Sequence, residues 1–120
     1  MNKGRKITSG KYHANRKKKF YEKQTQETTT VLAETKRKQV RVAGGNTKTI
    51  LLRSDTANIV TNGKAQKTKI LNVIETPQNT FLARQNRLLK GAIVQTELGK
   101  ARITNRPSQE GQINAILLTE

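Results

Sequence analysis

The sequence lacks cysteine and tryptophan altogether, and only 3% of its 120 residues are aromatic. Without cysteine there are no disulfides, no thiolate zinc sites and no cysteine-ligated iron–sulfur clusters. No run of about 18 apolar residues occurs, so no transmembrane helix is expected. The first 20 residues are basic and polar, without the apolar core of a secretory signal peptide. These absences favour an intracellular protein in a reducing compartment.

Negative charge is also scarce, with 8 Asp and Glu against 24 Lys and Arg, a formal net charge of +16. A protein with this charge attracts polyanions, and each phosphate that it neutralises releases condensed counterions. A membrane surface is the alternative partner, but it requires a basic amphipathic helix with a bulky apolar face. The basic segments here have no apolar stripe. The composition therefore favours nucleic acid and predicts no membrane partner.

The charges and the apolar residues are distributed unevenly along the chain. Residues 1–53 carry 15 Lys and Arg against 3 acidic residues, whereas residues 54–120 carry 9 against 5. Large apolar residues are sparse up to Thr30 and recur in short clusters from Val31 onward. The pattern predicts a basic RNA-binding arm, residues 1–30, and a folded body, residues 31–120. Because so polar a segment cannot offset its ordering entropy, we expect the arm to become ordered only on RNA.

The body alternates short stretches rich in Val, Ile, Leu and Thr with turn residues, a pattern typical of β-strands. The turn signals are Gly44-Gly45-Asn46, Asn62-Gly63, Leu98-Gly99 and the Arg106–Gly111 loop. The predicted strands are Lys38–Ala43, Thr47–Arg53, Ala57–Thr61, Lys67–Glu75, Ala92–Thr96, Lys100–Thr104 and Gln112–Leu118.

The segment Gln78–Leu89 follows Pro77 and does not alternate, so it is predicted to form one or two helical turns. So many short strands favour a small barrel or sandwich. The predicted fold is mainly β: a small barrel-like antiparallel body with one short helix, a thin core and an extended basic N-terminal arm.

No catalytic constellation stands out. The single histidine, His13, lies in the arm without a partner to orient it or a pocket to tune it. The internal carboxylates of the body each sit at a strand end or turn beside a basic neighbour and are interpreted as surface partners of Lys and Arg. The Gly44–Lys48 segment superficially resembles a phosphate-binding loop, but it leads into a strand instead of a helix. A hairpin loop whose amides form an anion nest is the preferred interpretation.

Three basic groups form the predicted RNA-binding surface: one in the arm, one around the first hairpin, and one around the helix and last hairpin. The basic residues at 36–38 are interpreted as the lead-in to a strand, on which Lys36 and Lys38 would share one face and Arg37 and Arg41 the other. The complete predicted set is Lys3, Arg5, Lys6, Lys11, Tyr12, His13, Arg16, Lys17, Lys18, Lys19, Lys36, Arg37, Lys38, Arg41, Gly44, Gly45, Asn46, Lys48, Arg53, Arg84, Arg87, Lys90, Lys100, Arg102 and Arg106.

Three aromatic residues, Tyr12, Phe20 and Tyr21, are interleaved with the cations of the arm. Two alternatives stay open for them. They either stack on unpaired bases, which stabilises a complex by about 1–3 kcal/mol per base, or pack back onto the body.

Several motifs resemble the small-subunit ribosomal protein family S8e of archaea and eukaryotes. They are spread over nearly the whole chain: Gly4-Arg5-Lys6, Arg16 to Glu22, Arg41 to Lys48, Lys69 to Val73, Glu75 to Asn79, Lys90 to Val94, and Thr96 to Pro107. Two departures, Ser108-Gln109-Glu110-Gly111 for Gly-Gln-Asp-Gly and Pro77-Gln78-Asn79 for Pro-Ala-Asn, conserve the turn chemistry. The short length resembles the archaeal form.

The resemblance implies a barrel-like body, a cytoplasmic location in the small ribosomal subunit, and contacts with small-subunit ribosomal RNA and neighbouring ribosomal proteins. It implies no cofactor, no metal, no small-molecule substrate, no homo-oligomer and no enzymatic activity. Two rival interpretations are a free-standing nucleic-acid chaperone or chromatin-like protein and a small RNA-modifying or nuclease enzyme.

Overall fold

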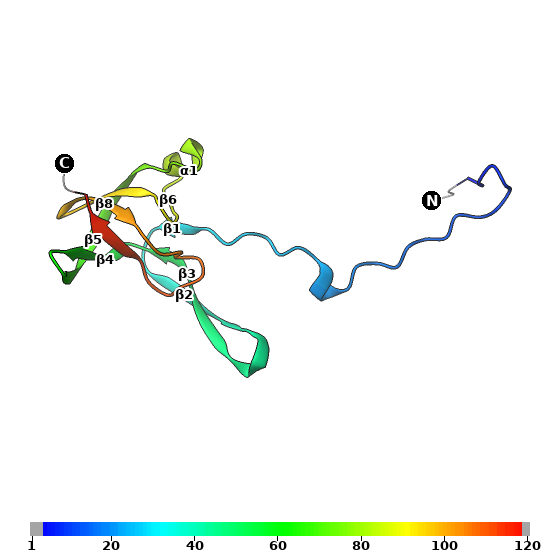
Figure 1. The fold of residues 1–120 in the computed structure, drawn as a ribbon, viewed down its shortest axis with the longest axis horizontal. Coiled ribbons are helices and arrows are strands. Elements are labelled where there is room, and N and C mark those ends of the chain that lie inside the picture. The colour runs from blue at the N-terminus through cyan, green and yellow to red at the C-terminus, as the bar shows by residue number, and fades with distance from the viewer. Residues whose placement is uncertain (1–3, 119–120) are drawn as a thin grey trace.

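The computed structural model describes residues 4–118, which form a β-rich body and an N-terminal segment that leads away from it (Figure 1). The predicted mainly β fold with one short helix is confirmed. The predicted strands are present as β2 (Lys36–Arg41), β3 (Thr47–Ser54), β4 (Thr56–Thr61), β5 (Lys64–Glu75), β7 (Ile93–Thr96), β8 (Gly99–Ile103) and β9 (Asn114–Leu117), and the helix is α1 (Thr80–Arg84).

Five strands close into a barrel in the order β4-β5-β7-β8-β9. Successive neighbours are antiparallel, but β9 returns to β4 in parallel, with Ile59 opposite Ala115. A meander with an odd number of strands ends in the direction in which it began, so its closing pair must be parallel. The other four pairs of the barrel are antiparallel, as predicted for the body, and this closing pair is the exception.

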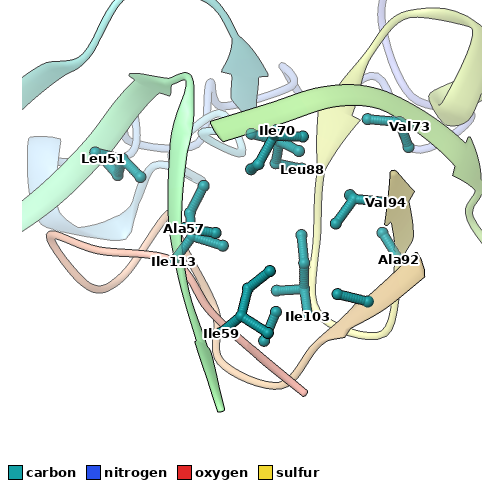
Figure 2. Packing of buried hydrophobic residues seen from close by; sticks show 12 residues of the cluster. Leu51, Ala57, Ile59, Ile70, Val73, Leu88, Ala92, Val94, Ile103 and Ile113 are labelled. Atoms are coloured by element: carbon teal, nitrogen blue, oxygen red, sulfur yellow. The ribbon is translucent and has the colours of Figure 1, made fainter. Parts of the chain in front are cut away.

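Alternating small and branched residues fill the barrel (Figure 2). The most deeply buried side chains alternate with outward-facing ones along each strand. Those at most 1% exposed include Ile59, Val94, Ala101, Ile103 and Ala115. Alanine recurs because a five-stranded barrel leaves little interior volume. The core is therefore thin, as the sequence predicted.

A bulge interrupts the alternation of β5. The register with β7 shifts between Ile70 and Asn72, and both Ile70 and Val73 point into the core although they are three residues apart. The Asn72 side-chain oxygen accepts a hydrogen bond from the amide of Val73 (2.9 Å). Leu71 and Ile74 consequently face solvent, with 57% and 44% exposure.

A second sheet of order β2-β3-β1-β6 contains two strands that were not predicted, β1 (Thr30–Leu32) and β6 (Arg87–Leu88). β1 pairs with β3 in parallel and with β6 antiparallel. The one or two helical turns predicted within Gln78–Leu89 are confirmed as α1, which ends at Arg84, and Asn86 then adopts a left-handed conformation with φ of 52°. This reversal brings Leu88, which is fully buried, onto the sheet.

Two predicted turns adopt the geometry that their residues favour. Gly44 and Gly45, between β2 and β3, have φ of 76° and 75°. Asn62 and Gly63, between β4 and β5, have φ of 48° and 78°, the positive pair that a two-residue hairpin turn of type I′ requires.

Candidate nucleic-acid interface

The arm exposes nearly everything that it carries. Of residues 4–29, only Glu22 and Thr29 are even half-buried. A short turn is closed by a bridge between Arg5 and Lys11 and by a hydrogen bond from the Arg5 guanidinium to the main-chain oxygen of Ser9 (3.1 Å). Lys3, from the predicted set, lies outside the described residues.

A second turn, which we call the arm turn, spans Arg16–Glu22 and includes the 3-10 helix η1 (Phe20–Glu22). The two terminal nitrogens of the Arg16 guanidinium donate to the two carboxylate oxygens of Glu22 (2.6 and 2.8 Å). The amide of Lys19 donates to the same carboxylate (2.9 Å). The Arg16 guanidinium, and secondarily the Lys19 amide, hold the pKa of Glu22 below its ordinary value.

The arm is attached to the body at its last two residues. The Thr30 hydroxyl is buried and donates to the main-chain oxygen of Leu51 (2.8 Å). The Arg87 guanidinium donates to the hydroxyl of Thr29 (2.7 Å). Arg87, predicted to contact RNA, thus also fixes the point at which the arm leaves the body.

The third predicted basic group is spread over the body. Lys90 and Arg106 line one groove together with Glu27 of the arm. Arg84 belongs to another groove between α1 and β5, and Arg102 lies on β8, opposite Ile116 on the outer face of the barrel. Lys100 is the second residue of the same strand. These five cations, and Arg87 at the point where the arm joins the body, are therefore distributed over two separate grooves and the outer face of the barrel.

The basic residues at 36–38 of the second group lie within β2 itself, so their interpretation as a lead-in is wrong. Lys36 pairs with Arg53 and Arg37 with Leu51, so the register skips Leu52 and the extra residue of this bulge lies on β3. Leu51 and Ser54 of β3 are accordingly both buried although they are three residues apart. β2 has no extra residue, so its alternation keeps Lys36 and Lys38 on one face, as predicted.

The β2–β3 hairpin is braced against the C-terminal loop, residues 104–113. Arg37 donates through Nε to the main-chain oxygen of Gly111 (2.7 Å), and the Lys48 ammonium donates to the side-chain oxygen of Gln109 (2.6 Å). A methyl group at Gly111 would lie 3.0 Å from Cγ2 of Thr49. Two of the cations predicted to bind RNA thus also contact protein.

Some exposed cations were not included in the predicted RNA-binding set. Lys64, Lys67 and Lys69 lie on β5 and are exposed. They follow the Asn62-Gly63 turn directly, so weighing the cations beside every predicted turn would have included them.

No group of three or more His, Cys, Asp or Glu in residues 4–118 is placed to hold a metal ion. His13 is exposed in the arm. No helix in this part of the chain is long and apolar enough to cross a bilayer.

The fold and its surface define a small basic β-barrel protein with a long cationic arm. Sequence comparison identifies the family. Residues 1–118 match the family Ribosomal protein S8e. Small ribosomal subunit protein eS8 of Methanocorpusculum labreanum is 47% identical over 116 residues, which cover 95% of this chain and 93% of that protein. The protein of the same name from Sulfolobus acidocaldarius is 44% identical over 122 residues, covering 99% and 95%.

The chain therefore belongs to the ribosomal protein S8e family, and the predicted resemblance is confirmed. The family consists of structural proteins of the ribosome, not enzymes, so the prediction that the chain is not an enzyme is also confirmed.

Proposed function

We propose that this protein is a structural constituent of the cytoplasmic small ribosomal subunit, where it binds and stabilises small-subunit ribosomal RNA. The observation that carries the proposal is the exposed cationic arm. Residues 4–29 hold eight Lys and Arg against two Glu. The radius of gyration is 21.6 Å, against about 14 Å for a compact domain of this length. Extended cationic chain of this kind suits a folded polyanion with grooves deeper than a compact domain can enter.

The body supplies the fixed geometry for this binding. The arm leaves the body at Thr30, and the β2–β3 hairpin projects from the body as a second extension (Figure 1). The hydrogen bonds at Thr30 and Arg37 hold the bases of these two extensions. The barrel thus sets the spacing between two RNA contacts, which favours a defined RNA fold over a random polyanion. We propose neighbouring small-subunit proteins as further partners and no self-association.

Deletion of residues 1–23 tests the role of the arm. This segment carries nine Lys and Arg. Each phosphate contact contributes about 0.7–0.9 to the slope of log affinity against log salt. We expect the truncated protein to bind small-subunit ribosomal RNA more weakly and with a slope reduced by several units. An unchanged slope would show that the arm does not contact phosphate.

Cosedimentation separates the proposal from the chaperone alternative. A ribosomal constituent stays with the small subunit through a gradient at physiological salt. A chaperone that binds nucleic acid loosely would instead be released into the light fractions.

A further inference from the structure

The aromatic residues of this protein are absent from its core. Its four aromatic side chains, Tyr12, Phe20, Tyr21 and Phe81, are 55%, 92%, 76% and 64% exposed. Phenylalanine and tyrosine ordinarily supply much of the buried area of a small domain. Here the core consists of aliphatic residues, so the aromatic rings contribute little to folding. Their place on the surface points to binding.

Two of the four rings are adjacent in the arm turn, directly after the longest run of cations in the chain. Phe20 and Tyr21 follow Lys17, Lys18 and Lys19 directly. The Lys19 ammonium lies 5.9 Å from the centre of the Tyr21 ring, within the range of a cation–π contact. Neither ring packs against the body, which removes one of the two alternatives for their role.

The arm turn holds these rings in place through an acidic residue. Glu22 accepts two hydrogen bonds from Arg16 and one from the Lys19 amide. Its charge is therefore engaged inside the turn, while Lys17, Lys18 and Lys19 form no salt bridge with a carboxylate of residues 4–118. The turn thus presents apolar ring faces next to unneutralised cations, a combination that matches a nucleic acid with exposed bases.

We propose that the arm turn is a binding site for unpaired RNA bases, with Phe20 and Tyr21 stacking on bases of a bulge or loop and Lys17–Lys19 binding the flanking phosphates. The proposal rests on the function proposed above and adds a ligand class to it. A paired duplex offers the lysines the same phosphates but offers the rings no free base face. The site therefore distinguishes unpaired from paired RNA, which electrostatic attraction alone does not.

The test compares an RNA hairpin that carries a bulge of two purines with a fully paired hairpin. For the full-length protein, we expect the variants Phe20→Leu and Tyr21→Leu each to reduce the preference for the bulged RNA at least about fivefold, the lower end of base–aromatic stacking. The slope of affinity against salt stays unchanged, because no charge is lost. Phe81→Leu is the control: this ring is also exposed and beside a cation, 5.8 Å from Arg84, but it lies on α1. We expect it to retain the preference.

The variants Glu22→Ala and Glu27→Ala separate the effect of the turn's conformation on RNA binding from the effect of net charge. Both raise the net charge from +16 to +17. If only charge mattered, both would bind both RNAs more tightly and to the same extent. We expect Glu22→Ala alone to lose the preference for bulged RNA, because it removes the hydrogen bonds that shape the turn.

Tyrosine emission gives an independent readout. The chain has two tyrosines and no tryptophan, so Tyr21 is the only such fluorophore in the variant Tyr12→Phe. We expect the bulged RNA to quench this emission and the paired RNA to leave it unchanged after correction for absorption. The base-binding site would be refuted if both ring variants kept the preference for the bulged RNA. It would also be refuted if the full-length protein bound both RNAs with equal affinity and a normal salt slope, and the proposed function would then still stand. Absence of salt-dependent RNA binding by the full-length protein would refute the proposed function itself.

Discussion

Arg37 and Gly111 are 74 residues apart in sequence, yet the Arg37 Nε donates to the Gly111 main-chain oxygen over 2.7 Å. The contact joins the β2–β3 hairpin to the C-terminal loop. That loop is itself bound to β3, where the amide of Leu51 donates to the main-chain oxygen of Pro107 (3.2 Å). The direction of a basic hairpin is therefore determined by a segment that carries little charge of its own.

Substitution of Gly111 by alanine tests the closeness of this approach. The added methyl group would lie 3.0 Å and 3.3 Å from the Cγ2 and Cβ atoms of Thr49, so the loop or β3 must shift. We expect a loss of about 1–2 kcal/mol in the free energy of unfolding, as for other overpacked sites. Urea denaturation measures it. Gly4→Ala is the control, because nothing lies within 4 Å of its added methyl group. Equal stability of the two variants would show that the loop has room to move.

The brace itself is tested by paired substitutions that remove equal charge. The double variant Arg37→Gln, Lys48→Gln loses both contacts to the C-terminal loop, whereas Lys38→Gln, Arg41→Gln removes two exposed cations of the same hairpin. A hydrogen bond of this kind contributes about 0.5–1.5 kcal/mol. We expect amide hydrogen exchange across the β2–β3 hairpin to accelerate several-fold in the first variant only. Similar acceleration in both would attribute the effect to charge.

The sequence predicts the barrel well because period-two alternation and turn residues are local signals. β1 and β6 were missed because strands of three and two residues carry too little local pattern and are defined by their pairing with distant segments. In β1, Val31 pairs with Arg53 of β3 and Thr30 pairs with Leu88 of β6. The bulge at Leu52 of β3 was not predicted, because it shows only in the register of β3 with β2. The location of the charges was predictable, but their partners were not. No local pattern indicates that Arg37 reaches Gly111.

Two buried threonines, one hydrogen-bonded and one without a partner among the described residues, should respond differently to replacement by valine. Thr30 and Thr76 are both fully buried. The Thr30 hydroxyl donates to Leu51, whereas that of Thr76 has no hydrogen-bond partner among the described residues. We expect Thr30→Val to lower the free energy of unfolding by about 1–2 kcal/mol, and Thr76→Val to leave it unchanged or raise it by up to about 1 kcal/mol. Thermal and urea unfolding of both variants measure the difference. A loss of stability in Thr76→Val as large as that in Thr30→Val would show that its hydroxyl is satisfied.

The ion pair of the arm turn predicts a pH dependence. Because Arg16 and the Lys19 amide lower the pKa of Glu22, the turn is stabilised while this carboxylate is ionised. The stabilisation is complete above the ordinary pKa of a glutamate and is lost as the pH falls through the lowered value. We expect the amide resonance of Lys19 to titrate with Glu22, at a pH below the ordinary pKa of a glutamate. In the variant Arg16→Gln the Lys19 titration moves up toward that ordinary value, because the principal cause of the shift is removed. A Lys19 titration at the ordinary glutamate pKa in the unmodified protein would show that the arm turn does not form in solution.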